Sequence, residues 1–411
     1  MKNAIFTIVS NNYYSRALTL MDSLKKQAME TDLFVCLVDK KQNEIDYRVD
    51  GFSLLNIDDI ECDLLQEMKF KYNVTELNTA IKPFVFELLF AKYEKVLYLD
   101  PDIYVFNSLA EIFSELDEAS VVLTPHLNCA IMEKGEDCLI ETEVSSTGIF
   151  NLGFCGFKKS ELSQKIIKWW CNKLESYCFM DFNRGQFYDQ KWMNFLPVLA
   201  NGELKILKQP GYNFAPWNFC ERTIYSDEDT YFVKDVEGNI SKLYFMHFSG
   251  FDPDLPDFLI QQHFNEIKIS DAVLEMLKNY AEALKNSHYD EFSSIPYFYG
   301  QFENGDQITL LHRQLYRGLL DMGKSYDDPF SVKKNSFHAL LKKKKLLDNR
   351  KEMLKKSQIK NLDAKMSKAN KVMRACKRIL GIRKYTQLLK YLQFITQFKN
   401  QLFLLGHQKG E

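Results

Sequence analysis

The 411-residue sequence has no apolar stretch close to the ~20 residues that a membrane-spanning helix needs. Its first apolar run, Ala4–Val9, is shorter than the core of a signal peptide. Asn11 and Asn12 follow it, where a cleavage site would have small residues. We therefore expect a cytoplasmic protein, which leaves open a peripheral attachment to the inner face of the plasma membrane.

Paired cysteine motifs are also missing. The nine cysteines are scattered, and none belongs to a CxxC pair. An odd, unpatterned set indicates free thiols in a reducing compartment, in place of a disulfide framework or a zinc site. We expect these cysteines to be small buried hydrophobic residues.

The net charge is small, at −2, but it is unevenly distributed. Residues 333–411 contain 22 Lys and Arg against 4 Asp and Glu, a net charge of +18, so residues 1–332 carry −20. A basic tail on an acidic body suggests that the tail meets a polyanion. The apolar share of 46% and the charged share of 26% are ordinary for a globular protein and exclude a largely disordered chain.

Short apolar runs alternate with helical patterns from the first residues onward. After the first run, further predicted strands lie at residues 33–38, 52–57, 96–99 and 121–123. Apolar residues at helical spacing are clearest at residues 14–26, 162–174 and 270–284. This alternation predicts an α/β fold with a parallel sheet, whose ligands bind at the carboxyl ends of the strands. Residues 128–148 show neither pattern, and we expect a surface loop or lid there.

The most specific motif is Asp100-Pro101-Asp102, directly after an apolar strand. Residues i and i+2 of an extended chain point the same way, so both carboxylates would face one cation. Hard oxygen ligands suit Mg²⁺ or Mn²⁺, which bind substrate phosphates. Aspartates are also common at strand ends and in turns, so the motif alone does not establish a metal site.

Leu97–Val105 resembles the DxD segment of nucleotide-sugar glycosyltransferases with the GT-A fold. Further segments agree in order and spacing with glycosyltransferase family 8 and with bacterial enzymes of surface-polysaccharide synthesis. They are the strand that ends at Ser10-Asn11, Phe150–Phe154, Asp189-Gln190-Lys191-Trp192 and His247–Gly250. The resemblance covers residues 1–255. It implies a Rossmann-like α/β fold with a mixed, mainly parallel sheet flanked by helices, to which this chain adds a basic helical C-terminal tail.

We expect three segments along the chain. Residues 1–260 would form the GT-A catalytic domain, 261–332 a helical extension packed on it, and 333–411 a basic amphipathic helical tail. In the tail, apolar residues recur at three- and four-residue steps from Val372 to Leu402, and Gly381 is expected to break the helix. Basic residues among them fit a helix on an anionic membrane surface. Packing on this protein or on a second copy is the alternative, and we expect no nucleic-acid partner.

The resemblance implies that a divalent cation, Mn²⁺ or Mg²⁺, bridges the two donor phosphates. Asp100, Asp102 and His247 would be its ligands. The implied donor-binding residues are Ser10, Asn11, Tyr13, Asp39, Lys82, Asn151, Gly153 and Gly250. Lys82 would meet a phosphate at a helix N-terminus, an end that favours anions. The segment after His247 departs from the family, because Phe251-Asp252-Pro253 stands where members often have a lysine.

The stereochemical course depends on whether a base exists. The Asp189-Gln190 pair favours retention, with Gln190 near the anomeric carbon and Asp189 holding the sugar. Inversion needs a base that deprotonates the acceptor hydroxyl, and the candidates are Asp189, Asp252, Glu221 and His126. The aromatic-rich segment 212–218 would be either an acceptor platform or a packed core loop.

Together these features predict a hexosyltransferase-type enzyme with a UDP-linked donor and a saccharide or lipid-linked saccharide acceptor. A sugar nucleotidyltransferase is disfavoured, because Ser-Asn-Asn-Tyr-Tyr follows the first strand where that class has a basic glycine-rich loop. A non-catalytic saccharide- or nucleotide-binding protein stays open, since only turnover separates it from an enzyme.

Overall fold

The computed structural model describes residues 2–130, 138–228, 230–254, 270–347 and 362–406. The chain forms two compact units, the first made of Met1–Met68 and Val74–Phe298, the second of Lys69–Asn73 and Tyr299–Glu411. Along the sequence, the assignment to a unit changes after residues 68, 73 and 298, whereas we expected boundaries after residues 260 and 332. The division into a catalytic domain, a helical extension and a basic tail stays a prediction.

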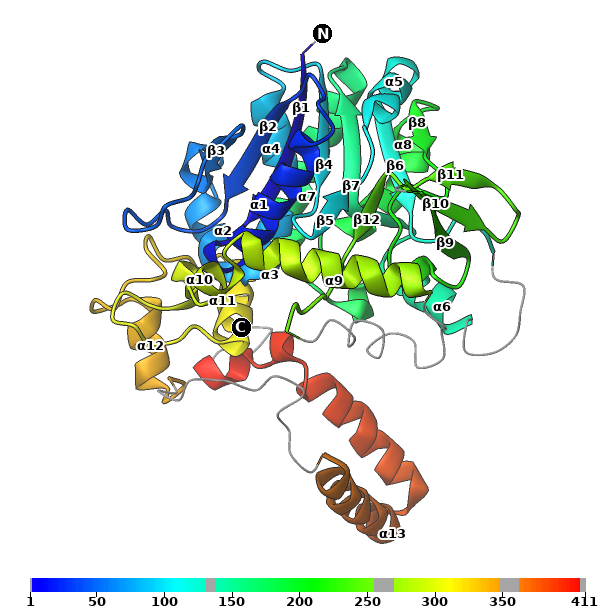
Figure 1. The fold of residues 1–411 in the computed structure, drawn as a ribbon. Coiled ribbons are helices and arrows are strands. Elements are labelled where there is room, and N and C mark those ends of the chain that lie inside the picture. The colour runs from blue at the N-terminus through cyan, green and yellow to red at the C-terminus, as the bar shows by residue number, and fades with distance from the viewer. Residues whose placement is uncertain (1, 131–137, 229, 255–269, 348–361, 407–411) are drawn as a thin grey trace. The chain divides into compact units, whose positions relative to one another are not determined.

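The first unit is built around a seven-stranded sheet with the strand order β3-β2-β1-β4-β7-β6-β8 (Figure 1). Neighbouring strands are parallel except at β7, which runs antiparallel to both β4 and β6. The predicted mixed, mainly parallel sheet is therefore confirmed. Its strands are β1 (Asn3–Val9), β2 (Asp32–Leu37), β3 (Ser53–Asn56), β4 (Lys95–Leu99), β6 (Val121–Pro125), β7 (Phe150–Lys158) and β8 (Leu204–Ile206).

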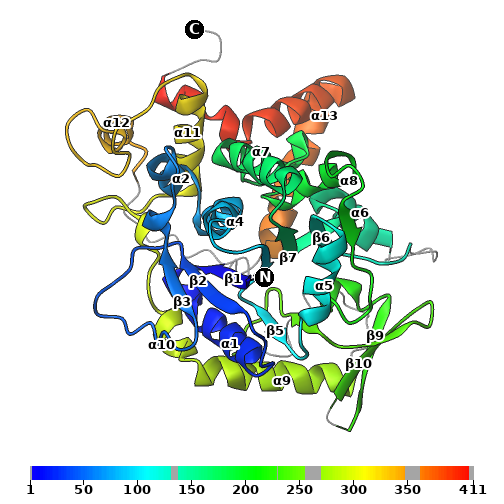
Figure 2. The ribbon, with the colours of Figure 1, turned by 90° about the horizontal axis from the view of Figure 1, so that it is seen from above.

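Helices cover both faces of this sheet, which is why its strands are apolar on both sides (Figure 2). Ile5 belongs to the core that also contains the apolar residues of α1 and α5. The next residue, Phe6, points to the other face, where its ring centre is 4.8 Å from that of Phe86 on α4. The covering helices are α1 (Tyr14–Lys25) and α5 (Ala110–Glu118) on one face, and α4 (Lys82–Leu89) and α7 (Glu161–Tyr177) on the other.

Two smaller sheets complete the first unit. A two-stranded sheet pairs β5 (Ile103–Val105) with β12 (Phe245–His247), and the register places Ile103 opposite His247. A three-stranded sheet contains β9 (Arg222–Asp227), β10 (Thr230–Asp235) and β11 (Ile240–Lys242). The predicted late helix forms as α9 (Asp271–Asn286), packs with both small sheets in one core, and precedes α10 (Tyr289–Ser293).

Residues 128–148 differ from the expected loop or lid. Cys138–Thr147 forms helix α6, so the expectation was wrong there, and residues 131–137 lie outside the described residues. Only Ile140 of its described side chains is buried, so the apolar pattern is too sparse to predict a helix. The other short helices are α2 (Leu65–Lys71), α3 (Val74–Ala80) and α8 (Leu196–Leu199).

The second unit has an apolar core that includes both ends of the basic tail. Phe337 and Leu341 of α12 (Phe337–Lys343) pack in this core with α11 (Leu310–Asp321), and so do Leu402 and Leu405. Between these ends lies α13 (Leu362–Ile395), whose Gly381 has non-helical backbone angles, as predicted (φ 69°, ψ 164°). The tail is thus not one surface helix, since its described ends belong to this core while most described side chains of α13 are exposed.

None of the described helices combines the length and the apolar content needed to cross a membrane. Among the described cysteines, Cys36, Cys155, Cys171 and Cys178 are buried.

Candidate active site

Asp100, Asp102 and His247 lie together where three strands of the first unit end or begin. Asp100 follows β4, Asp102 precedes β5, and His247 ends β12, the strand that pairs with β5. Each offers one ligand atom, and the three atoms lie within 4.8 Å of one another. His247 Nε2 is 3.1 Å from Asp102 Oδ1 and 3.7 Å from Asp100 Oδ2. The fold therefore gathers the three predicted metal ligands.

A tight turn, and not an extended chain, brings the two aspartates together. Ile103 N donates to Asp100 O at 3.1 Å and closes the turn, in which Pro101 takes the second position that suits its fixed φ. Asp100 N donates to Gly153 O of β7 at 2.7 Å, which anchors the start of the turn. The expectation that strand alternation aligns Asp100 and Asp102 was wrong.

The electrostatics of the cluster suit a cation. Burial raises the pKa of Asp100. Burial acts in the same direction on Asp102, but the charge and hydrogen bond of His247 together with the charge of Arg16 lower the pKa of that carboxyl. Burial disfavours the imidazolium, but the charge and hydrogen bond of Asp102 together with the charge of Asp100 raise the pKa of His247. One partly buried carboxylate, one buried carboxylate and one buried imidazole thus face one another. Hard oxygens with a single imidazole nitrogen fit Mn²⁺ or Mg²⁺.

Gly153 of β7 makes room for the imidazole. A Cβ there would lie 2.4 Å from His247 Cε1 and 2.8 Å from Asn151 Oδ1. We expect Gly153→Ala to displace His247 and to weaken Mn²⁺-dependent nucleotide binding, with an overpacking cost of about 1–3 kcal/mol. The matched control is Gly156→Ala on the same strand, whose Cβ would meet Leu97 and Val122 instead. Titration calorimetry of both variants checks this, and equal nucleotide affinities would contradict it.

Lys82 and Asp189 form a buried ion pair close to the cluster. Lys82 Nζ lies 2.5 Å from Asp189 Oδ2, and the side chains are 1% and 4% exposed. The ammonium also donates to Leu152 O at 2.7 Å and lies 4.2 Å from the ring centre of Tyr98. Lys82 begins α4, at a helix N-terminus as predicted. Its contact with a phosphate and the contact of Asp189 with a sugar stay predictions.

Gln190 and Asn151 are held in place by hydrogen bonds. Gln190 Oε1 accepts from Leu152 N, and its Nε2 donates to Thr147 O, both at 3.2 Å. Asn151 Oδ1 accepts from Gly153 N at 3.1 Å and from Asn213 Nδ2 at 3.0 Å. This orients Asn151 Nδ2 toward His126 Nε2 at 3.3 Å. The imidazole of His126 therefore accepts through Nε2 and carries its proton on Nδ1.

His126 is the buried group that links stability to pH most clearly. Burial lowers its pKa from 6.5 to about 4, so the unfolded chain binds the extra proton between these values. Stability should therefore fall by about 1.4 kcal/mol per pH unit as pH drops from 6.5 towards 4. His126→Gln keeps an acceptor for Asn151 and should flatten this part of the profile. Urea unfolding of both proteins at several pH values measures it, and identical slopes would refute the assignment.

This chain is similar to known proteins in sequence. Residues 4–183 match the sequence model of Glycosyl transferase family 8. Over these residues the chain is similar to that family. It is 23% identical over 256 residues to the uncharacterized protein YfnF and 26% identical over 253 residues to the uncharacterized protein YfnD, both from Bacillus subtilis strain 168. These matches cover 61% and 60% of this chain and 82% and 76% of the relatives.

Solved glycosyltransferases share similarity over a larger part of the chain. An active-site mutant of LgtC is 16% identical with a TM-score of 0.42, and the match covers 71% of this chain and 97% of that one. The glycosyltransferase GlyE of Streptococcus pneumoniae TIGR4 is 16% identical with a TM-score of 0.40, covering 77% and 73%. With the family match and the observed sheet, the protein is a glycosyltransferase of GT-A fold that takes a nucleotide-sugar donor.

Two residues predicted to bind the donor, Asp39 and Asn11, hold together the loops that follow strands β1 and β2 of the first unit. Asp39 accepts from the backbone of Asn11 at 3.3 Å, Lys40 at 2.8 Å and Phe298 at 3.0 Å. Burial nevertheless raises the pKa of Asp39 to about 6. Asn11 Oδ1 accepts from the hydroxyl of Tyr47 at 2.8 Å. These contacts position the loops, and direct contacts with a base or ribose stay predictions.

Arg16 is a residue of the first unit that the sequence did not single out. Its guanidinium lies 4.0 Å from the ring centre of Tyr13, and its Nη2 donates to Phe251 O at 2.9 Å, just beyond Gly250. Its Nε is buried with no hydrogen-bond partner among the described residues. A basic residue within a helical pattern usually faces solvent. The one feature of the sequence that could have indicated a role for Arg16 is its place shortly after the predicted donor-binding residues Ser10–Tyr13.

A cavity of about 260 Å³ adjoins the cluster and is lined by Asn151, Gln190, Trp217 and Ser249 among others. The ring of Trp217 stands edge-on to His247 with centres 5.1 Å apart, and its buried Nε1 has no partner among the described residues. Tyr212 and Phe214 are buried in the core. Segment 212–218 is thus a core loop that presents Trp217 to the cavity.

Two carboxylates that could act as the base of an inverting mechanism, Glu221 and Asp252, make other contacts. Glu221 is buried, pairs with Arg222 Nε at 2.9 Å, and accepts from the backbone of Asn128 and Cys129. Asp252 accepts from the backbone N–H of Asp254 at 3.1 Å. Neither carboxylate lines the cavity described above.

Proposed function

We propose that the enzyme is a metal-dependent hexosyltransferase that transfers a sugar from a UDP-linked donor with retention. The acceptor would be a saccharide or lipid-linked saccharide in bacterial surface-polysaccharide synthesis. The cluster of Asp100, Asp102 and His247 carries this proposal, because a donor diphosphate leaves only when its charge is neutralised. The cavity beside it supports the proposal with space for a sugar and polar groups from Asn151 and Gln190.

In this proposal, different residues bind the cation and the donor sugar. Asp100, Asp102 and His247 would hold Mn²⁺ or Mg²⁺, which supplies Lewis-acid stabilisation of the leaving diphosphate when bound. Gln190, fixed by two hydrogen bonds at 3.2 Å, would lie near the anomeric carbon. Asp189 would hold the sugar from its place beside Lys82.

The state of the candidate bases supports retention. Asp189 is paired with Lys82, Glu221 with Arg222, and a pKa of about 4 keeps His126 neutral at pH 7 and a weak base. The proton of the acceptor hydroxyl would then go to the leaving diphosphate. Glu143 on α6 is an exposed carboxylate that also lines the cavity, so it is the group an inverting mechanism would use. NMR of the anomeric proton in the first-formed product decides between the two courses.

A thermal-shift panel tests the donor and the metal together. UDP, GDP, CDP and dTDP are each added with and without Mn²⁺. Ligand at about 100 times its Kd stabilises a protein by about 2.7 kcal/mol, which moves the melting temperature measurably. We expect a Mn²⁺-dependent shift with UDP. A shift with another nucleotide would correct the base, and no shift with any would favour a non-catalytic saccharide-binding protein.

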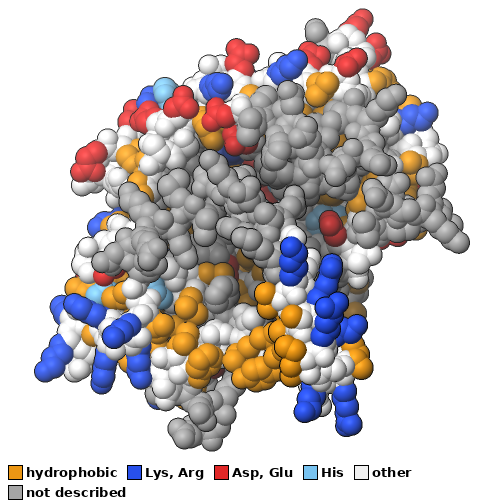
Figure 3. All heavy atoms as spheres, turned by 90° about the horizontal axis from the view of Figure 1, so that it is seen from below, with side chains coloured by type: hydrophobic (Ala, Val, Ile, Leu, Met, Phe, Trp, Pro, Cys, Tyr) orange, Lys and Arg blue, Asp and Glu red, His pale blue; other side chains and the backbone are white. Residues whose placement is uncertain are grey.

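We also propose that α13 attaches this enzyme to an anionic membrane from the cytoplasmic side. Its apolar side chains are exposed, with Ile379 82% and Ile382 65% exposed, where a packed helix would hide them. Basic residues such as Arg383 and Lys384 lie among them, and blue and orange side chains sit side by side on the face in Figure 3. Apolar area together with positive charge is what binds a helix to such a surface.

Ile379→Asp/Ile382→Asp in the full chain should reduce binding to vesicles of phosphatidylcholine and phosphatidylglycerol. Each buried isoleucine contributes about 1.5–3 kcal/mol, so the partition coefficient should fall by more than about tenfold. Co-sedimentation measures this. Val198→Asp, at a position 81% exposed in the first unit, is the matched control and should bind as wild type. Unchanged sedimentation of the double variant would exclude α13 as the attachment.

A further inference from the structure

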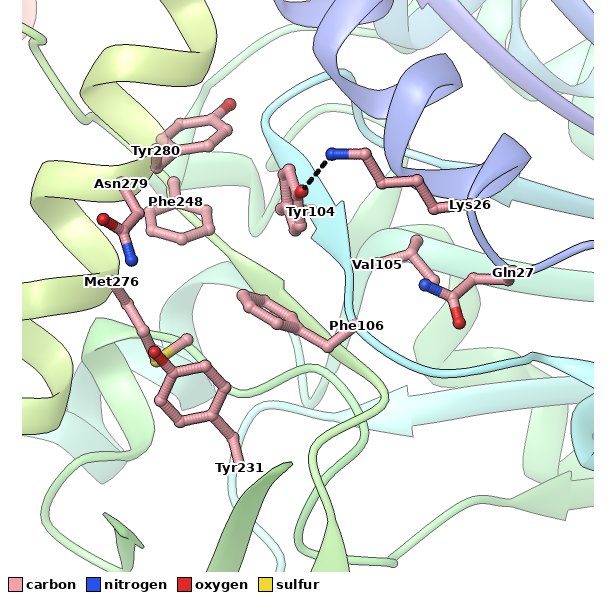
Figure 4. Close-up of a pocket in the computed structure, with 10 residues that line it drawn as sticks. All are labelled: Lys26, Gln27, Tyr104, Val105, Phe106, Tyr231, Phe248, Met276, Asn279 and Tyr280. Atoms are coloured by element: carbon pink, nitrogen blue, oxygen red, sulfur yellow. Dashed lines mark hydrogen bonds between the residues drawn. The ribbon is translucent and has the colours of Figure 1, made fainter. Parts of the chain in front are cut away.

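A second cavity of the first unit, about 250 Å³ in volume, is lined mainly by aromatic rings (Figure 4). Tyr104 comes from β5, Phe106 directly follows that strand, Tyr231 comes from β10, and Phe248 directly follows β12. The ring of Phe106 stands edge-on to that of Tyr231 at 5.6 Å and tilted to that of Tyr104 at 5.0 Å. Tyr104, Phe106 and Tyr231 are each only partly buried, so part of each side chain is accessible from solvent.

The rim of this aromatic cavity is polar. Lys26 and Gln27 lie at one side and Asn279 of α9 at the other, and Lys26 and Asn279 are exposed (Figure 4). Lys26 Nζ donates to the hydroxyl of Tyr104 at 3.2 Å. Ammonium and amide groups supply donors and acceptors around an apolar floor. A lipid chain has no polar group that could form hydrogen bonds with the rim. A ligand with both apolar faces and hydroxyl groups could form them.

A wall of two rings separates the aromatic cavity from the metal cluster. Phe248 directly follows His247, and its ring stacks on that of Tyr280 with centres 3.9 Å apart. The hydroxyl of Tyr280 points away from the cavity centre (Figure 4), and the charge of Asp102 contributes to its raised pKa after burial. A ligand in the aromatic cavity would thus lie behind the transfer site, outside the cavity beside Gln190.

We infer that the aromatic cavity is a second saccharide site, which binds one pyranose unit of a glycan outside the transfer site. The C–H face of a pyranose ring lies flat on an aromatic face, and its equatorial hydroxyls reach amides and ammonium groups at the rim. The volume is below the range of drug-sized ligand pockets and suits a single sugar ring. The class of ligand rests on the proposed function, since a glycosyltransferase with a saccharide acceptor meets glycans continually.

The test uses the full chain with UDP and Mn²⁺ present and methyl pyranosides of glucose, galactose, N-acetylglucosamine and rhamnose as probes. Saturation-transfer difference NMR reports contact of each probe with the protein. At least one probe should bind wild type, and Phe106→Ala/Tyr231→Ala should lower its affinity by about tenfold, as expected for two lost ring contacts. Asn279→Ala changes only an exposed rim residue and should also weaken binding, which keeps the test valid if the double variant unfolds.

Two controls separate this inference from the proposed function. Tyr225→Ala removes a 41% exposed ring from β9, outside the aromatic cavity, and should leave probe binding unchanged. Asp102→Asn should remove donor turnover and keep probe binding. If no donor is turned over while the probe binds wild type and not the cavity variants, the proposed function fails and the second site stands. Absence of binding by every probe, or equal binding to wild type and cavity variants, overturns the second site.

Discussion

Asp102→Asn should abolish Mn²⁺-dependent nucleotide binding and reduce sugar transfer by about 10³-fold or more. The substitution keeps the shape of the side chain and removes a negative charge 3.1 Å from His247 Nε2. A cation that neutralises a leaving diphosphate is worth several kcal/mol in the transition state, and each 1.4 kcal/mol is about tenfold in rate. Because Asp102 is buried beside Asp100, no water-exposed group replaces the lost ligand.

Titration of UDP with and without Mn²⁺, followed by turnover of UDP-sugars, measures this prediction. Asp254→Asn removes an exposed carboxylate from the segment after His247 and should behave as wild type. The Gly153→Ala variant should show a partial version of the same loss, since it displaces His247 without removing charge. Full Mn²⁺-dependent binding in Asp102→Asn would mean that the cation is held elsewhere or is not needed.

Lys82→Met should destabilise the first unit by about 3–5 kcal/mol, because it leaves the Asp189 carboxylate buried without its partner. The two side chains are 1% and 4% exposed, so solvent cannot compensate the charge. Asp189→Leu should be destabilising for the same reason, with the ammonium left to Leu152 O. The double variant Lys82→Met/Asp189→Leu should recover much of the stability, since an apolar pair can replace a buried ion pair at little cost.

A double-mutant cycle by urea unfolding checks this coupling, and simple additivity of the two single losses would contradict it. The same variants separate structure from function. If Lys82 meets a donor phosphate, the double variant will be stable and yet bind UDP weakly. If the pair only holds α4 against the chain around Leu152, the double variant will bind UDP as wild type does.

The sequence predicted the order of strands and helices well because apolar periodicity is a local property. It did not predict the direction of β7, since a fully buried strand has the same pattern whether parallel or antiparallel. Helix α6 was missed because it buries little apolar surface. The two ends of the basic tail belong to the core of the second unit, and tertiary packing of Leu402 and Leu405 leaves no signal in local composition.

The sequence also predicted part of the candidate site, namely its residue types at strand ends, but not the contacts between them. Asp100, Asp102 and His247 were found because carboxylates and an imidazole at strand ends are conspicuous, and the structure brings them together. The pairing of Lys82 with Asp189 depends on chain geometry across 107 positions of sequence separation. Arg16 was missed, because it lies within a helix whose pattern already explains it.

The central claim is that this cluster supports nucleotide-sugar transfer with a divalent cation. The most direct test is to incubate the full-length enzyme with UDP-glucose, UDP-galactose and UDP-N-acetylglucosamine, each with Mn²⁺ or with EDTA, and to measure released UDP. We predict release from at least one donor that requires Mn²⁺ and is lost in Asp102→Asn. Release that is equal in EDTA and Mn²⁺, or equal in wild type and Asp102→Asn, would contradict the claim.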